Sequence, residues 1–283
     1  MIDQQELELL ISKRLEAGEV ELPVFDDIAL RINREVRENK LDADLICQII
    51  EEDLALVAEL LKMANSAFFA GMSPVGSLKE AAVRLGVRQI ASIVFSVSQK
   101  RLYSASSGLF KSRLTRLWEH TSAVSLGSRW LAANAGFRRL ADEAFVSGLL
   151  HDIGKLSLLC ILEEIIAKEG LEISDEIVDA TLLSMNCEHG EYLLESWNLP
   201  EEYKTIVRNQ NAEELDPSNT VLAIIRLVDK VCIVEGIADM DYEEDFDIVN
   251  MKEVQALSLC EEDLSELSLI LQEAKGGETS KAA

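Results

Sequence analysis

Residues that interrupt helices are scarce in this chain. Only 4 of its 283 residues are proline and 14 are glycine. Apolar residues recur at three- and four-residue spacings instead of alternating, which is typical of amphipathic helices and leaves little room for strands. The 48% of hydrophobic residues is enough for a substantial core. The sequence therefore predicts an all-α globular fold and excludes disorder along the whole chain.

Positive charge is also scarce. Lys and Arg number 27 against 51 Asp and Glu, which leaves a net charge of −24. Binding to nucleic acid or to an anionic membrane depends largely on clustered Lys and Arg side chains. A field of this sign opposes both kinds of partner. We therefore expect neither nucleic acid nor a membrane among the partners of this protein.

Paired cysteines and a targeting segment are lacking as well. The five cysteines form no C-x-x-C pair and stand mostly among apolar residues, which indicates a reducing compartment. Asp3, Glu6 and Glu8 stand where a signal peptide would carry positive charge. We also expect no apolar run to approach the roughly 20 residues of a membrane span. The sequence predicts a cytoplasmic location.

Capping residues mark several helix ends. Asp53 is placed to accept hydrogen bonds from the first free amides of a helix that ends near Asn65. Ser77 and Glu80 have the spacing of a capping box before a short helix that ends at Gly86. Further helical patterns span residues 113–135, 141–167, 175–196, 201–210, 218–236 and about 250–274.

Breaks in these patterns suggest three parts. A segment rich in small residues near position 110 separates an N-terminal helical subdomain, 1–110, from a second helical subdomain, 111–240. The remainder, 241–283, is expected to hold an acidic linker, a C-terminal helix and a polar tail.

The chain has only three histidines, and one of them opens a His-Asp doublet. His151 and Asp152 stand in Gly-Leu-Leu-His-Asp-Ile-Gly-Lys, which ends at Lys155, four residues after the histidine. A neighbouring imidazole and carboxylate offer one nitrogen and one oxygen ligand to a common metal site. This octapeptide resembles the signature of the HD superfamily of metal-dependent phosphohydrolases. The resemblance implies a ligand set of His120, His151, Asp152 and Asp229.

Two members of that set have simpler interpretations when taken singly. His120 lies on the polar edge of a helix, where a surface or capped histidine is common. Asp229 interrupts the apolar run from Ile224 to Val231, and its carboxylate needs a partner or a metal there. An ion pair with Arg226 or Lys230 would satisfy it. The ordered match to the superfamily pattern favours the ligand role for both residues.

The remaining motifs are similar to one branch of that superfamily. They are Leu22-Pro23, the segment Leu61–Phe69 with its Ala-Asn-Ser-Ala-Phe core, and the stretch from Val75 to Gly86. Together with the octapeptide they identify the chain as a member of the HDOD family, the HD-related output domain, from about residue 20 to about 210. This resemblance implies a multi-helix HD-like core at 111–240 with an N-terminal helical subdomain before it.

His189 precedes a Trp-x-Leu-Pro turn, as the family pattern requires. In related HD-GYP enzymes the equivalent histidine helps to hold a second metal, so His189 is a further candidate ligand. The sequence departs from those enzymes where a His-His pair is expected, because Asn209 and Gln210 stand there, and no Gly-Tyr-Pro motif appears. Hydrolysis of cyclic di-GMP at a two-metal site is therefore not expected.

Two imidazoles and two carboxylates suit a divalent transition metal such as Fe, Mn, Ni or Co better than a structural zinc, which prefers thiolates. Such an ion could activate a water molecule and polarise a phosphoryl oxygen. If the site is catalytic, Asp152 and Lys155 are the residues expected to take part, Lys155 by stabilising developing negative charge.

Three functions follow from these observations. The first is a signal-transduction output module, in which the metal site is structural or vestigial and the N-terminal helices present a surface to signalling protein partners. The second is a metal-dependent phosphohydrolase acting on a nucleotide or another small phosphoester. The third is a nucleic-acid-binding regulator, because Ser77–Gly86 and Val87–Val97 resemble a helix-turn-helix. Residues 77–101 hold Lys79, Arg84, Arg88, Lys100 and Arg101 against the single acid Glu80.

Overall fold

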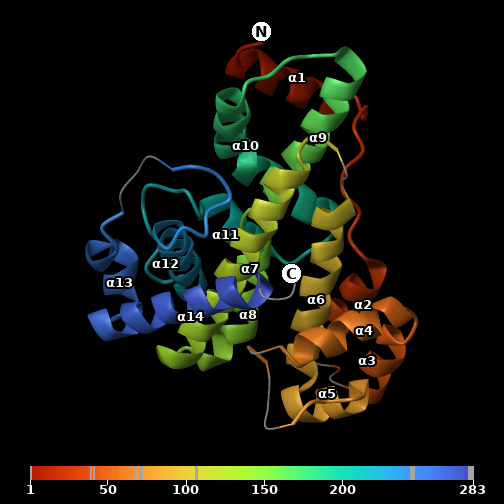
Figure 1. Cartoon of the computed structure of the whole chain (residues 1–283), viewed down its shortest axis with the longest axis vertical. Helices are drawn as coiled ribbons and strands as arrows, with labels where there is room; N and C mark the ends of the chain where they lie inside the picture. Colours follow the sequence, from red (N-terminus) through yellow and green to blue (C-terminus); the bar gives the residue numbers. More distant parts are fainter. Residues whose placement is uncertain are drawn as a thin grey trace. The chain divides into compact units, whose positions relative to one another are not determined.

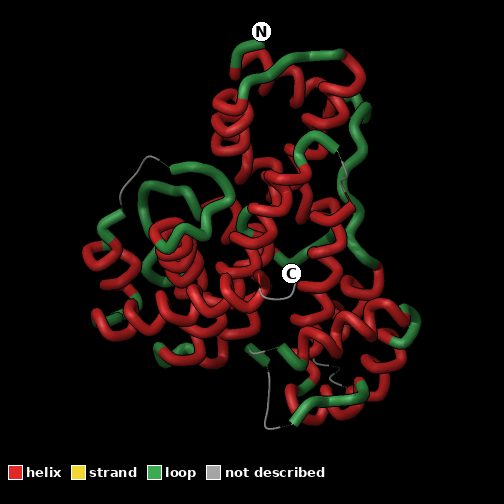
Figure 2. The backbone as a smooth tube through the Cα atoms, viewed as in Figure 1, coloured by secondary structure: helices red, strands yellow, loops and turns green. Residues whose placement is uncertain are grey.

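The computed structural model is helical throughout the part of the chain that it describes, which is residues 2–38, 40, 42–66, 68–69, 73–105, 108–242 and 246–279. Within these residues Figure 2 shows helices and loops and no strand. The all-α prediction is confirmed. Contacts between residues divide the chain into two compact units, Met1–Val24 with Tyr103–Leu271, and Phe25–Leu102 with Gln272–Ala283. The sequence divided the chain into three segments by composition, whereas these two units are defined by contacts. The three-part division therefore stays a prediction.

The first unit contains most of the helices (Figure 1). They are α1 (Gln4–Glu16), α7 (Lys111–Asn134), η1 (Arg138–Leu140), α8 (Ala141–Leu150), α9 (Ile153–Glu169), α10 (Asp175–Ser196), α11 (Glu201–Asn209), α12 (Thr220–Val234), η2 (Ile248–Asn250), α13 (Lys252–Ala256) and most of α14 (Glu261–Thr279). The most extensive packing joins α7 to α8 and α9 to α10, and α12 lies against α7. A core of aliphatic side chains from α7, α8, α12 and α14 fills this unit.

Glycines permit two close helix crossings in this unit. A Cβ on Gly148 would lie 2.6 Å from the Cα of Ser125, so α8 can approach α7 only without a side chain there. A Cβ on Gly154 would lie 2.0 Å from the backbone oxygen of Asn186, which applies the same restriction to α9 and α10. Since real Cβ contacts are never so short, larger residues would push these helices apart.

The second unit contains α2 (Asp27–Arg37), α3 (Ala43–Ile50), α4 (Leu54–Ala64), α5 (Leu78–Leu85) and most of α6 (Val87–Ala105). The Asp53 carboxylate caps α4 as predicted, accepting from the N–H groups of Ala55 and Leu56. Ser77 caps α5 through the N–H of Glu80. The Glu80 carboxylate, however, accepts from the N–H of Gly76, so only half of the predicted capping box forms.

The prediction of one continuous helix over 141–167 is wrong, because the segment forms two helices. It breaks into α8 and α9 at His151 and Asp152, which lie in a turn. The backbone of Asp152, with φ −107° and ψ 20°, ends the helical geometry there. The break therefore falls on the doublet that carries the candidate chemistry.

The predicted C-terminal helix over about 250–274 also divides, into η2, α13 and α14. Ser258 adopts a positive φ of 55° after α13, a conformation that a helix cannot contain. Asp263 then accepts a hydrogen bond from the N–H of Cys260 just before α14. The spacing of apolar residues does not reveal a positive φ at a serine, so the sequence pattern did not predict this break.

The expectation that no apolar run approaches a membrane span is also wrong. The segment Arg138–Glu169, which holds α8 and α9, is long and apolar enough by length and composition. However, 94% of its apolar window is buried inside the protein, as in the core helix of a globular unit. The pair Leu78–Leu85 and Val87–Ser104 passes the same test only if its two helices count as one span, and they meet at an angle of 118°.

Candidate metal centre

His120 projects from the middle of α7 and is completely buried. Its Nδ1 lies 2.7 Å from the carbonyl oxygen of Ile237, in the segment that follows α12. Its Nε2 lies 3.1 Å from Oδ1 of Asp229, a residue of α12. Asp229 of α12 and the segment after α12, both more than 100 residues away from His120 in the sequence, thus contact the two ring nitrogens. The interpretation of His120 as a surface histidine is excluded by its burial.

His151 stands at the carboxyl end of α8 and is 1% exposed. Its Nδ1 lies 2.7 Å from the carbonyl oxygen of Gly148, one turn back. Its Nε2 lies 3.3 Å from Nε2 of His120 and 3.3 Å from Oδ2 of Asp152. Gln210, which stands where an HD-GYP enzyme would have a histidine, donates from its side chain to the carbonyl oxygen of His151.

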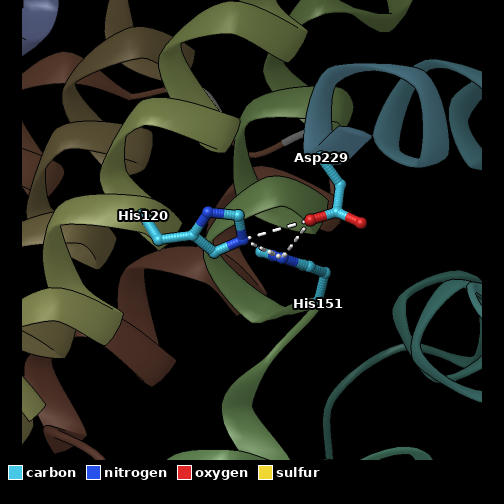
Figure 3. A group of neighbouring side chains, drawn as sticks. All are labelled: His120, His151 and Asp229. Atoms are coloured by element: carbon cyan, nitrogen blue, oxygen red, sulfur yellow. Dashed lines mark hydrogen bonds and ion pairs between the residues drawn. The ribbon is translucent and has the colours of Figure 1, made fainter. Parts of the chain in front are cut away.

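The hydrogen bonds of the two rings determine which nitrogens carry hydrogen. Both Nδ1 atoms face carbonyl oxygens, which only accept, so Nδ1 is the donor in each ring. In neutral rings each Nε2 then presents a lone pair. Figure 3 shows these two Nε2 atoms and one carboxylate oxygen of Asp229 turned toward one another. Three acceptors so arranged repel one another unless a cation, either a proton or a metal ion, lies among them.

The spacing of these acceptors fits a metal ion. The ligand atoms of His120, His151 and Asp229 all lie within 4.8 Å of one another. Two ligands bound at about 2.1 Å to one ion, at adjacent positions, lie roughly 3.0–3.4 Å apart. The distances of 3.3 Å between the imidazoles and 3.1 Å between His120 and Asp229 match that range, whereas Nε2 of His151 and Oδ1 of Asp229 are 4.0 Å apart, wider than adjacent positions. In addition, the Nδ1 bonds to carbonyl groups are the outer interactions that usually orient histidine ligands.

The sequence leaves two roles open for Asp229, a metal ligand or a partner in an ion pair, and its two carboxylate oxygens fit one role each. Its Oδ1 faces His120, while its Oδ2 lies 3.0 Å from Nζ of Lys230. Arg226, the other proposed partner, pairs with Glu253 instead and donates to the carbonyl of Ala212. One carboxylate oxygen therefore remains directed at the histidines even though an ion pair is present.

Asp152 is buried, and each of its oxygens is engaged. Oδ1 accepts from Nδ2 of Asn186 at 2.7 Å, and Oδ2 lies 2.7 Å from Nζ of Lys155. Oδ2 also lies 3.7 Å from Nε2 of His120. The fourth predicted ligand thus lies beside the two histidines, but its Oδ2 is also bonded to a buried lysine.

Lys155 is 4% exposed and is held by two carboxylates. Besides Asp152 its Nζ contacts Oδ2 of Asp239 at 2.9 Å and the hydroxyl of Tyr242 at 3.4 Å. The Tyr242 hydroxyl donates in turn to Oδ1 of Asp239 at 3.0 Å. A second group with metal-binding potential consists of His120, Asp152 and Asp239. The ammonium of Lys155 therefore lies beside Asp152 and Asp239, two of the three candidate ligands in this second group.

Sequence reasoning missed Asn186, Asp239 and Tyr242. Tyr242 lies in the predicted acidic linker, which begins at residue 241, and Asp239 lies just before it, after the end of α12; Asp239 is 5% exposed. Asn186 lies in the middle of α10 in a polar run with no recognisable spacing to the doublet. Only the apposition of α9 and α10 brings it to Asp152. No signal in one sequence could have identified these three residues.

The charges of the site shift the acidities of its groups. Burial raises the pKa of Asp229, but Lys230 and His120 outweigh it and leave that pKa below its usual value. Burial also raises the pKa of Asp152, whereas His151 and Lys155 bring it well below the usual range. For His120, burial lowers the pKa, but the hydrogen bond to Asp229 and the neighbouring carboxylates raise it to about 9. The carboxylates thus remain ionised and attract a cation.

His189 lies in α10 outside this cluster of charges. It is 5% exposed, and burial alone lowers its pKa to about 4. Among the described residues its side chain has no hydrogen-bond partner and belongs to neither group with metal-binding potential. Its candidacy as a further ligand stays a prediction.

In the second unit the cations of the helix-turn-helix-like segment are engaged with the protein itself. Arg101 pairs with Asp53 at 2.6 Å and Lys79 approaches Asp44 at 3.7 Å. Arg84 donates to the backbone oxygens of Ser73 and Ala64. A nucleic-acid phosphate would have to compete with these partners, and the net charge of −24 opposes its approach.

Residues 22–213 match the family described as HDOD domain. A relative from Treponema pallidum (strain Nichols), described as an uncharacterised protein, is 27% identical over 196 residues. That match covers 66% of this chain and 37% of the relative, so the chain spans little more than a third of the relative's length.

Solved structures share the fold over most of the chain. An HDOD domain protein of unknown function from Geobacter sulfurreducens has a TM-score of 0.75 at 20% identity, covering 97% of this chain and 96% of its own. A protein from Shewanella amazonensis SB2B, whose name assigns it provisionally to the metal-dependent phosphohydrolases, has a TM-score of 0.76 at 21% identity, covering 98% and 99%.

A third structure, from Marinobacter aquaeolei VT8, is named provisionally as a signal transduction protein. It has a TM-score of 0.69 at 21% identity, and the match covers 99% of this chain and 68% of that one. At these identities the likeness to solved structures establishes the fold alone.

Proposed function

Because the chain belongs to the HDOD domain family, we propose that it is a cytoplasmic regulatory output module of signal transduction. In this proposal its HD-type site holds one divalent transition-metal ion in a structural role. The observation that carries the structural role is burial: the side chains of His120, His151, Asp152 and Lys155 are at most 5% exposed, and Asp229 is 16% exposed. A phosphoester needs direct access to a catalytic ion, and all of these groups except Asp229 are closed off from solvent.

His120, His151 and Asp229 would hold the ion, with Asp152 as a fourth ligand. Two nitrogens and two carboxylate oxygens favour Fe, Mn, Ni or Co over a thiolate-bound structural zinc. A bound ion would supply the positive charge that the facing lone pairs and carboxylates require. In its absence a proton on Nε2 of His120 serves that purpose in part, in keeping with the raised pKa of this ring.

Protein partners are the expected targets of such a module. The name of the Marinobacter aquaeolei relative supports a signalling context. The net charge of −24 and the occupied cations of α5 and α6 argue against a nucleic-acid target. Neither nucleic acid nor a membrane is part of the proposal.

The test is metal analysis followed by a screen for hydrolysis. Protein purified without chelators is assayed for bound Fe, Mn, Co and Ni by mass spectrometry, and then for turnover of nucleotides and generic phosphoesters. We expect about one ion per chain and no turnover. Absence of any metal, with no binding on titration, would contradict the proposed site.

The second candidate function is a metal-dependent phosphohydrolase. It is favoured by the complete set of four ligands and by Lys155, whose Nζ lies 2.7 Å from Asp152 and could stabilise a developing negative charge. If turnover is observed and Asp152→Ala abolishes it while Asp241→Ala does not, the hydrolase replaces the structural role. Asp241 is a suitable control because its side chain is 98% exposed.

A further inference from the structure

Aspartate residues at helix starts in this protein normally cap their own helices. Asp26, Asp42 and Asp53 each adopt an extended backbone, and each accepts a hydrogen bond from an N–H group in the first turn of its helix. This satisfies one of the amides that have no partner in the first turn. Asp152 occupies the same N-cap position before α9 but makes no such side-chain bond.

Two features keep Asp152 from capping. Its backbone, with φ −107° and ψ 20°, lies outside the extended conformation that Asp53 adopts at φ −125° and ψ 101°. Its carboxylate is also directed at the metal centre, where Oδ2 meets Lys155 and His151. A carboxylate that serves the site cannot also turn back to the amides of α9.

Asn186 supplies the side-chain acceptor that Asp152 does not offer. Its Oδ1 accepts from the N–H of Lys155, the third residue of α9, at 3.1 Å, and the backbone oxygen of Asp152 shares that N–H at 3.0 Å. Its Nδ2 donates to Oδ1 of Asp152 at 2.7 Å. Since an N–H only donates and a carboxylate only accepts, these two partners determine the orientation of the amide without ambiguity. Asn186 is 1% exposed, so no water competes freely for either bond.

From this geometry we infer that Asn186 is a positioning residue for the metal centre. It caps α9 from the neighbouring helix and at the same time holds the Asp152 carboxylate so that Oδ2 points at the histidines. Asparagine suits both tasks because it offers one acceptor and one donor. Gly154 allows the arrangement, since a Cβ there would lie 2.8 Å from Oδ1 of Asn186 and 2.0 Å from its backbone oxygen.

The inference rests on the proposed metal site, and the experiment separates the two. Full-length protein is stripped of metal, and Co²⁺ is titrated into it while its visible absorption bands are recorded. Binding by the unchanged protein tests the site itself. Asn186→Ala is then compared with it under the same conditions, with folding confirmed by circular dichroism.

We expect Asn186→Ala to weaken Co²⁺ binding about 10–100-fold, as is typical when an outer partner of a ligand is lost, and to change the absorption bands. Thr181→Ala is the matched control. It lies on the same helix, is completely buried, and loses a hydrogen bond to the carbonyl of Ile177 that does not involve the site. The control should keep both the affinity and the bands.

A double-mutant cycle with Asp152→Ala tests whether Asn186 acts through the carboxylate. In that background Asn186→Ala should have little further effect on Co²⁺ affinity. Unchanged affinity and bands in the single variant, or full additivity in the cycle, would overturn the inference while the metal site stands. Failure of the unchanged protein to bind Co²⁺ would overturn both.

If Asn186→Ala does not fold, the unchanged protein still gives an answer. The side-chain amide signal of Asn186, assigned by NMR, should shift when diamagnetic Zn²⁺ is added, because the group is bonded to a ligand. Side-chain amides remote from the site, such as that of Asn134 at the end of α7, provide the reference. A signal of Asn186 that does not move would count against the inference.

Discussion

Two buried histidines of the first unit show opposite behaviour. His120 lies among three carboxylates, and its pKa is raised to about 9. His189 lies on α10, has no hydrogen-bond partner for its side chain among the described residues, and its pKa is lowered to about 4. Both rings are at most 5% exposed. Burial by itself therefore does not make a histidine a candidate ligand. The carboxylates that face His120 decide its role, because they stabilise a positive charge at the place where burial alone would repel it.

The largest expected difference between these two regions is in metal binding. Asp229→Ala removes the oxygen that lies 3.1 Å from Nε2 of His120, and we expect it to lower metal affinity more than about 100-fold, beyond the loss typical of an outer partner. His189→Leu should leave the affinity unchanged. Metal content after dialysis is the measurement, with Asp241→Ala as the surface control. Retention of the ion by Asp229→Ala would remove the distinction between the two histidines.

The second largest effect is expected for the charged side chains that lie near His120 and are absent around His189. Asp239→Asn leaves the buried ammonium of Lys155 with one charged partner in place of two. One of the two buried ion pairs is broken while Asp152 still compensates the charge, so we expect a loss of about 3 kcal/mol in the free energy of unfolding, the low end of the range for a broken buried pair. Urea denaturation of metal-free protein measures it. Asp241→Asn should change stability by less than about 0.5 kcal/mol, and equal effects for the two variants would show that no buried network exists.

The raised pKa of His120 predicts a loss of stability at high pH in metal-free protein. The folded state keeps this proton up to about pH 9, whereas the unfolded chain releases it near 6.5. The stabilisation is therefore fully present below pH 6.5 and is lost as the pH rises to about 9. It amounts to something on the order of 3 kcal/mol. His120→Gln should flatten this part of the profile, and an unchanged slope in that variant would assign the loss to other groups.

The lowered pKa of His189 predicts a smaller effect of opposite direction. The unfolded chain takes up a proton near pH 6.5, whereas the folded protein resists it until about pH 4. Stability is therefore lost as the pH falls through this window, by roughly 2 kcal/mol between pH 7 and pH 5. His189→Leu should reduce that loss and change stability at pH 7 by about 1 kcal/mol or less. A steeper loss in the variant would contradict the absence of a stabilising partner.

The helix positions and the four predicted ligands show what one sequence can reveal. The spacing of apolar residues predicted α10 at 175–196 with its observed bounds, and the cap at Asp53 was predicted from its residue type. His120, His151, Asp152 and Asp229 were brought together by resemblance to a known pattern, and in the structure both Asp229 and Asp152 lie close to the two histidines. Their roles remain the subject of the experiments above.

The interruption of the helix at His151 and Asp152 shows what one sequence cannot reveal. Apolar periodicity continues across the doublet, so a single helix over 141–167 was predicted, whereas the structure has two. At the break Asp152 is bonded to Asn186 of α10, a contact that arises only when α9 packs on α10. Local propensity contains no information about those contacts.

Helix content and charge were determined by the sequence itself, because they depend on residue type and on spacing along one helix. The candidate ligands were identified in the sequence by their resemblance to a family pattern. Tertiary structure alone decided that Asp239 and Tyr242 enclose Lys155, that Asn186 caps α9, and that His120 and His189 have opposite pKa shifts. The physical reason is distance. A buried charge responds to groups within a few ångströms, and these groups come from helices separated by many residues in the chain.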